Sequence, residues 1–197
     1  MGLGKTRQAL AIADAFKDDW PLLIVTTAAL REMWSKQILE LLPKVLSYDL
    51  RILLNNNTPI SDAKVVICSY AGLKLHIGKL ETKGFGMIIF DESHTLKTTT
   101  AEQTKYATRL ADSANRIICV SGTPALSRPA ELYTQLAIID RHFTDFYSFS
   151  KRYCAGHSTR FGWNADGHGN LRELHTILNK KFMIRRTKDE VYMELGN

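Results

Sequence analysis

The residues best suited to chemistry in this sequence are two adjacent acids, Asp91 and Glu92, with His94 close behind. They follow an apolar run, residues 87–90, which predicts a short strand buried on both faces. Two carboxylates at the end of a buried strand are costly unless a ligand uses them. Beside a phosphate-bound Mg²⁺ and an attacking water, one acid would hold the metal and the other would polarise the water. A strand followed by a solvated acidic turn is the alternative.

The start of the chain offers a site for phosphate. Residues 2–6 read Gly-Leu-Gly-Lys-Thr and match the end of a G-x-x-x-x-G-K-[ST] phosphate loop. Lys5 would reach the β- and γ-phosphates, and the Thr6 hydroxyl would bind Mg²⁺. Residues 6–13 predict a helix whose N-terminal dipole favours an anion, although a chance glycine turn would look similar. The predicted ATP-binding residues are Gly2, Leu3, Gly4, Lys5, Thr6 and Gln8, and the predicted catalytic residues are Lys5, Asp91 and Glu92.

Alternating strands and helices must position these residues. The predicted strands are 22–26, 51–54, 64–69, 87–90 and 116–120, and the predicted helices are 6–13, 28–42, 101–110 and 129–136. The strands are apolar throughout, which favours an α/β fold with a mainly parallel sheet and helices on both faces. Ligands of such sheets bind at the carboxyl ends of the strands. The polar residues expected there are Thr26 and Thr27, Ser69 and Tyr70, Asp91 and Glu92, and Ser121 to Thr123.

Composition and charge favour a globular protein that binds nucleic acid. Among 197 residues, 45% are hydrophobic and 23% are charged, which excludes a disordered chain, and the net charge is +6. A basic surplus in a phosphate-binding protein suggests a nucleic-acid partner. No apolar run is long enough to span a membrane, and no signal peptide precedes the glycine loop, so we expect no membrane partner. Cys68 and Cys119 lie in strand-like runs, which fits reduced thiols inside a cell.

Three stretches resemble motifs I, II and III of the Swi/Snf-type DNA-dependent ATPases, in that order. They are residues 1–10, 90–97 and 121–132, and residues 183–188 resemble the segment that closes the first motor lobe of the family. The resemblance implies the first RecA-like P-loop lobe of a translocase that acts on duplex or forked DNA, with ATP as substrate and Mg²⁺ as cofactor. It also implies a nuclear location in a eukaryote and a cytoplasmic one otherwise. Residues 127–129, 151–154 and 162–163 look most like the strand-annealing helicase branch, whose members rewind DNA and remodel stalled forks.

The resemblance also assigns roles to single residues. Thr6 and Asp91 would hold Mg²⁺, and Glu92 would position and deprotonate the water. The residues that would couple the nucleotide state to DNA are His94, Ser121, Gly122 and Thr123. The residues that would contact DNA are Thr27, Ser69, Tyr70 and Lys97. An RNA-directed helicase lobe is a further alternative, and the stretch after Thr123 argues against it by resemblance.

Two departures from the family pattern stand out. Residues 25–28 read Val-Thr-Thr-Ala where Val-Cys-Pro-Ser is common, and the sequence starts inside motif I and ends just after the first lobe. We expect residues 1–140 to form the ATP-binding lobe, and residues 141–197 to form a helical and loop part of the same lobe that leads toward a second one. In the family the second lobe supplies an arginine finger, so we expect residues 1–197 alone to be inactive. The alternative is a catalytically inert remnant that binds DNA or a partner.

Residues 156–169 are rich in loop formers and also carry aromatic and basic side chains. Such a loop could stack on DNA, and a plain surface insertion is the alternative. Cys154, His157 and His168 are too few and too irregularly spaced to predict a zinc site. The basic pairs at 180–181 and 185–186 predict either a DNA-facing patch or a solvated face.

Overall fold

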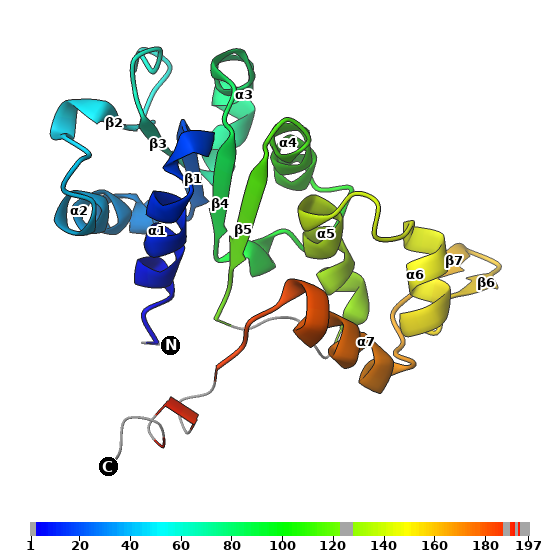
Figure 1. Ribbon diagram of the computed structural model, residues 1–197. Helices are drawn as coiled ribbons and strands as arrows, with labels where there is room; N and C mark the ends of the chain where they lie inside the picture. Colours follow the sequence, from blue (N-terminus) through cyan, green and yellow to red (C-terminus); the bar gives the residue numbers. More distant parts are fainter. Residues whose placement is uncertain (1–2, 123–127, 187–189, 192, 194–197) are drawn as a thin grey trace.

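A five-stranded parallel sheet forms the centre of the molecule in the computed structural model, which describes residues 3–122, 128–186, 190–191 and 193. The strand order is β2-β3-β1-β4-β5, and every neighbouring pair is parallel (Figure 1). The strands are β1 (Leu22–Thr26), β2 (Leu50–Ile52), β3 (Val65–Ser69), β4 (Met87–Asp91) and β5 (Arg116–Val120). The predicted α/β class with a parallel sheet is confirmed.

Helices cover both faces of this sheet, as predicted. Helices α1 (Lys5–Ala15) and α2 (Arg31–Leu41) lie on one face, and α3 (Leu73–Lys83) and α4 (Glu102–Ala111) lie on the other (Figure 1). Successive side chains of a strand point to opposite faces. Ile24 accordingly packs in the core under α1 and α2, whereas Leu23 and Val25 pack in the core under α3 and α4. Strands β1, β3 and β4 are buried along their whole length.

Strand β5 corrects one prediction, because the sequence suggested a buried strand at residues 116–120. In the described part of the chain it pairs only with β4 and forms an edge of the sheet. Arg116 is exposed, the next three residues are half-buried, and only Val120 is buried. An edge strand has a neighbour on one side only, so its outer side chains receive less cover from α1 and α5 than those of the central strands.

The C-terminal part adds a second, helical layer with its own core. Its elements are α5 (Pro129–Ile139), α6 (Phe146–Tyr153), α7 (Leu171–Ile177) and a π-helical turn (Leu178–Phe182). Helix α5 serves both cores, since Ile138 packs with the sheet and Leu132 and Leu136 pack against α6 and α7. The predicted division at residue 140 therefore stays a prediction. No helix in the described ranges has the length and apolar character needed to cross a membrane.

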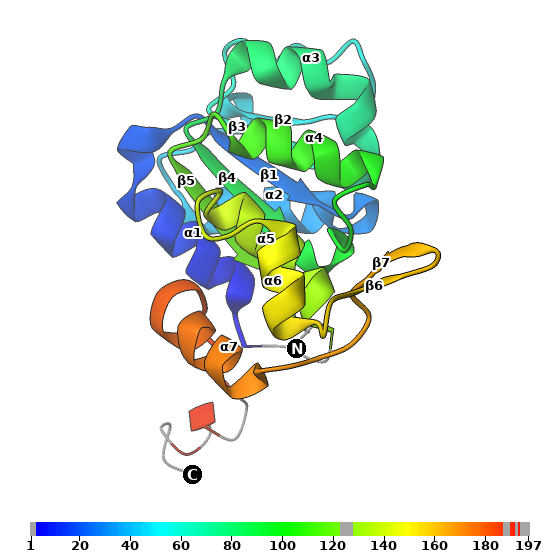
Figure 2. The ribbon, with the colours of Figure 1, turned by 90° about the vertical axis from the view of Figure 1, so that its right-hand side faces the viewer.

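Several boundaries and elements differ from the predictions. The predicted helix 28–42 is a 3-10 turn (Ala28–Leu30) followed by α2. The sequence interpretation did not recognise α3, although Leu73, His76 and Leu80 lie on its buried face at helical spacing. The segment predicted as a loop at 156–169 contains an antiparallel hairpin, β6 (His157–Thr159) and β7 (Gly162–Asn164), which projects from the body of the molecule (Figure 2).

Candidate active site

The carboxyl edge of the sheet brings the predicted catalytic and coupling residues together. Asp91 pairs in register with Val120 across β4 and β5, so Glu92 and Ser121, the next residues on each strand, are neighbours. Strand β1 lies on the other side of β4 and ends at Thr26. Three strand ends therefore meet at one place, as the parallel topology requires.

Asp91 is almost fully buried, with an exposed fraction of 5%. Its Oδ2 accepts hydrogen bonds from Trp34 Nε1 at 2.7 Å and from Thr26 Oγ1 at 2.9 Å. Its backbone carbonyl accepts a hydrogen bond from the Tyr70 hydroxyl at 2.8 Å. Both of these hydrogen bonds end at Oδ2, so they hold the carboxylate in one orientation. Neither of them involves Oδ1.

The sequence interpretation missed the role of Trp34. Trp34 lies within the predicted helix 28–42, and its ring is fully buried. A buried tryptophan nevertheless needs an acceptor for its indole N–H. No local pattern in the sequence identifies that acceptor, and the structure shows it to be Asp91.

Glu92 adopts a left-handed backbone conformation, with φ of 49° and ψ of 43°. A non-glycine residue in this region carries strain, which is often found at functional sites. Its Oε2 lies 3.1 Å from His94 Nδ1, and the same ring nitrogen lies 3.2 Å from Ser121 Oγ. The side chains of Glu92, His94 and Ser121 thus form a continuous polar chain from the end of β4 to the end of β5.

Lys5 faces this chain from the start of α1. Gly4, which precedes the helix, has φ of 69°, a conformation that glycine adopts without strain. A methyl group placed on Gly122 would lie 3.7 Å from Lys5 Nζ, so the ammonium sits beside the segment that follows β5. Gln8 Nε2 donates to the carbonyl of Leu3 at 3.0 Å and ties the loop to the helix. Gly2 and Thr123 lie outside the described residues.

The residues predicted to contact DNA lie on the same edge of the sheet. Ser69 and Tyr70 are buried, and Ser69 Oγ accepts the Gly72 N–H at 3.1 Å. Burial raises the pKa of Tyr70, which keeps its hydroxyl a donor to Asp91. Thr27 is half-buried and Lys97 is exposed. Their DNA contacts stay predictions, and Lys97 presents the largest accessible side chain of the four.

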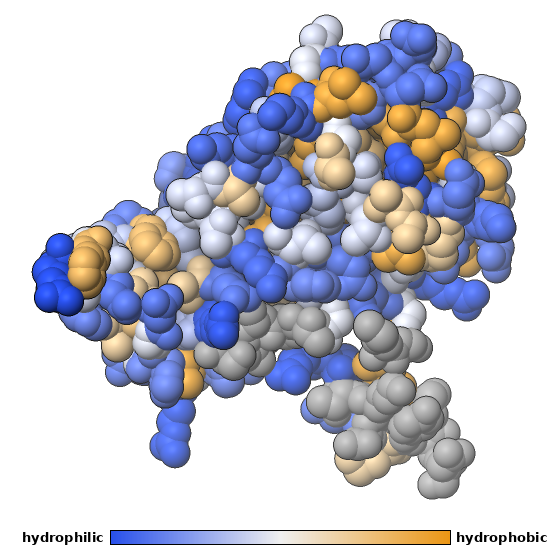
Figure 3. Space-filling view, turned by 180° about the vertical axis from the view of Figure 1, so that it is seen from behind, coloured by the Kyte–Doolittle hydropathy of each residue, from blue (hydrophilic) through white to orange (hydrophobic). Residues whose placement is uncertain are grey.

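The hairpin β6–β7 presents an aromatic ring to solvent. The Phe161 side chain at its tip is 86% exposed, and the Arg160 guanidinium lies 4.6 Å from the ring centroid. The base is anchored, because Trp163 Nε1 donates to Ser150 Oγ at 2.9 Å and the Trp163 ring packs against the Tyr147 ring, with centroids 4.5 Å apart. In the rear view of Figure 3 the hairpin is the projection at the left, where apolar and hydrophilic side chains lie together.

The site suits Mg²⁺ better than a metal that needs a dense ligand cluster. Within the described ranges, no group of three or more His, Cys, Asp or Glu side chains is placed to hold a metal ion. Mg²⁺ in nucleotide sites needs only one or two carboxylates, with phosphate oxygens and waters completing its shell. The Asp91 carboxylate and the Thr6 hydroxyl, the two predicted Mg²⁺ ligands, would be oxygen ligands of that type.

Comparison with known proteins gives the family. Residues 1–197 match the model of the SNF2-related domain. The chain is 55% identical over 196 residues to the SWI/SNF-related matrix-associated actin-dependent regulator of chromatin subfamily A-like protein 1 of Drosophila melanogaster, covering 100% of this chain and 26% of that protein. It is 38% identical over 206 residues to the DNA annealing helicase and endonuclease ZRANB3 of Mus musculus, covering 99% of this chain and 19% of that protein. The chain thus spans about a quarter or less of these relatives.

A solved structure supports the fold. The Sulfolobus solfataricus SWI2/SNF2 ATPase core in complex with dsDNA matches with a TM-score of 0.77 and 21% identity, covering 95% of this chain and 39% of that one. The sheet and its flanking helices are therefore those of a RecA-like lobe, as predicted. By its sequence match along the whole chain, this protein belongs to the family of SNF2-related domains.

Proposed function

We propose that this chain is the ATP-binding lobe of a DNA-dependent ATPase that remodels or reanneals duplex or forked DNA. The observation that carries the proposal is the polar chain from Glu92 through His94 to Ser121, which lies beside the oriented Asp91. The similarity to a DNA annealing helicase supports it, as does the similarity to an ATPase core bound to dsDNA. Lys5 beside Gly122 supplies the phosphate-binding cation of the same site.

The phosphates of ATP would bind at the start of α1. Backbone N–H groups of the glycine loop and the positive end of this 11-residue helix favour the anion, and Lys5 would contact the β- and γ-phosphates. Thr6 and Asp91 would hold Mg²⁺, which, when bound, neutralises charge on the phosphate oxygens. Trp34 and Thr26 hold the Asp91 carboxylate in one orientation, so the acid is positioned before the nucleotide arrives.

Glu92 would act on the attacking water. The water oxygen forms a bond to the γ-phosphorus and passes its proton to the Glu92 carboxylate, while the bond to the bridging oxygen breaks and ADP leaves. The left-handed conformation of Glu92 turns its side chain off the direction of β4 toward His94. A shift of Glu92 between nucleotide states would therefore displace His94 and, through it, Ser121. This is the proposed route for coupling to DNA.

A second lobe would complete the motor. The chain covers 39% of the SWI2/SNF2 ATPase core that it resembles, so that core holds more than this lobe. An arginine supplied from the far side of the γ-phosphate is worth about 10³–10⁵ in rate in related phosphoryl-transfer enzymes. We place the DNA surface at Thr27, Ser69, Tyr70 and Lys97, and the site of action in the nucleus of a eukaryotic cell.

The experiment is phosphate release by the protein with its second lobe, measured with and without duplex DNA. Lys5→Ala should weaken Mg-ATP binding and remove DNA-stimulated release, because it removes the ammonium that lies beside Gly122. Lys36→Ala is the matched control, since Lys36 is an exposed lysine of α2 with no assigned role in the site. Tight ATP binding that Lys5→Ala leaves unchanged would show that the assigned phosphate site is wrong.

A further inference from the structure

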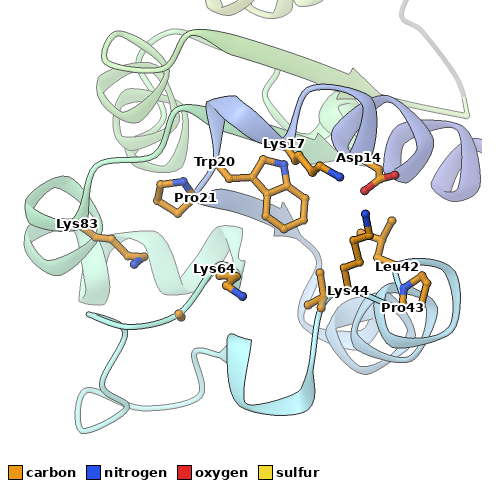
Figure 4. A pocket seen from close by; sticks show the side chains of 11 residues that line it. Asp14, Lys17, Trp20, Pro21, Leu42, Pro43, Lys44, Lys64 and Lys83 are labelled. Carbon is orange, nitrogen blue, oxygen red and sulfur yellow. The ribbon is translucent and has the colours of Figure 1, made fainter.

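A cavity of about 630 Å³ lies at the end of the sheet opposite the candidate active site. Its lining comes from segments that immediately precede β1 and β3 and from the C-terminal ends of α1, α2 and α3 (Figure 4). Strands β1 and β4 carry the catalytic residues at their other ends. A ligand in this cavity would therefore leave the ATP site free. Its size is that of ordinary ligand-binding clefts.

The floor of the cavity is apolar. Trp20 forms its centre, with Pro21 and Leu42 on either side (Figure 4), and Val45 also lines the cavity. The indole N–H of Trp20 already donates to the carbonyl of Ala13 at 2.9 Å, so the polar edge of the ring is satisfied and its face remains for contact. A ligand that fills this cavity must bring an apolar group, because a purely polar one would gain nothing from the floor.

The rim of the cavity is cationic. Four of the lining residues are lysines, namely Lys17, Lys44, Lys64 and Lys83, and one is an acid, Asp14. Lys64 is paired with Asp49 at 3.1 Å, and Lys83 donates to the carbonyl of Ser61 at 3.1 Å. In the part of the chain that the structure describes, the ammonium groups of Lys17 and Lys44 have no hydrogen-bond or ion-pair partner. Figure 4 shows both of them at the side of the cavity near Asp14.

We propose that this cavity binds an acidic peptide segment that carries one large apolar side chain. The apolar side chain would lie on Trp20, and the carboxylates would pair with Lys17 and Lys44. Charge complementarity and an apolar floor in one cavity fit a peptide, in which acidic and apolar groups alternate along a chain. Duplex DNA also offers negative charge, but its phosphates surround no accessible apolar group that could fill the floor. The binding site is independent of the proposed ATPase function.

The test is fluorescence anisotropy of a labelled twelve-residue peptide of Asp and Glu with one central Phe, titrated with the protein at physiological salt. The double charge reversal Lys17→Glu with Lys44→Glu should weaken binding about tenfold, because it replaces two attractions by two repulsions. The matched control is Lys36→Glu with Lys151→Glu, which makes the same change of net charge at exposed lysines outside the cavity. Circular dichroism should show that both variants are folded.

A second arm uses the wild-type protein, so it does not depend on any variant. Replacing the Phe of the peptide by Ser should weaken binding about tenfold or more, the scale of burying one aromatic side chain. Equal affinity for the two peptides, or equal losses in the cavity and control variants, would overturn the proposal. A titration with an oligodeoxythymidine of twelve nucleotides gives a further outcome. If only the cavity variant binds this DNA more weakly than wild type, the occupant is single-stranded DNA and the proposal is overturned. Phosphate release should be the same in all these variants, which separates this test from that of the ATPase function.

Discussion

The indole N–H of Trp34 donates a 2.7 Å hydrogen bond to Oδ2 of Asp91 and so joins helix α2 to the end of strand β4. The two residues are 57 positions apart in the sequence. Both are buried, so the bond is shielded from water, and Thr26 adds a second donor to the same oxygen. The proposed metal-binding acid is thus held by a residue whose sequence context predicts only a core position.

Replacing Trp34 by Phe tests this positioning. The variant keeps an aromatic ring in the core but loses a hydrogen bond to a charged group, a loss of about 1.5–3 kcal/mol. We expect the Mg²⁺ concentration for half-maximal phosphate release to rise by about tenfold or more. Trp163→Phe is the matched control, because it removes an indole N–H bond to Ser150 outside the site. An equal Mg²⁺ requirement in the two variants would show that Trp34 is only a core residue.

Replacing His94 by Ala tests coupling. The change breaks the contacts from Glu92 and to Ser121 and leaves Lys5 and Asp91 in place. Coupling free energies of about 0.5–2 kcal/mol predict a two- to thirtyfold fall in the ratio of DNA-stimulated to basal release. ATP affinity, measured by calorimetry, should change little. His142→Ala, at an exposed position, is the control, and an unchanged ratio in His94→Ala would remove this residue from the coupling route.

The hairpin tip gives a third prediction. If Phe161 stacks on an unpaired base, Phe161→Ala should weaken binding to forked DNA by about 1–3 kcal/mol and leave binding to blunt duplex nearly unchanged. Tyr48→Ala removes another ring, which is 63% exposed just before the edge strand β2, and should affect neither substrate. Equal affinities of wild type and Phe161→Ala for forked DNA would favour a plain surface insertion.

Glu173 predicts how the helical layer responds to acid. Hydrogen bonds from Arg152 at 2.7 Å and from the Tyr153 hydroxyl at 2.7 Å lower the pKa of Glu173 from 4.5 to about 2 and link α6 to α7. A carboxyl whose pKa is lowered by folding stabilises the folded state above its unfolded pKa. That stabilisation is lost as pH falls from about 4.5 toward 2. Urea unfolding should show that Glu173→Gln lowers stability at pH 7 and has a much smaller effect at pH 2.

Central strands and the acids at their ends could be predicted from sequence, because continuous apolar runs that stop at polar residues are distinctive. The runs at 22–26 and 87–90 became β1 and β4 within one residue. The burial of β5 could not be predicted in the same way, since exposure depends on which strands flank it. The hairpin at 157–164 was missed because its strands are three residues long and carry no apolar alternation. The contact of Trp34 with Asp91 is a tertiary one, and no local pattern reveals it.

The division of labour between Asp91 and Glu92 is tested most directly by measuring Mg-ATP affinity and DNA-stimulated phosphate release for Glu92→Gln and Asp91→Asn in the protein with its second lobe. Glu92→Gln should bind Mg-ATP like wild type and release phosphate about a hundredfold more slowly or worse, the scale of losing a general base. Asp91→Asn should lose affinity and Mg²⁺ dependence together. Equal losses of ATP affinity in the two variants, or normal release by Glu92→Gln, would contradict the assigned roles.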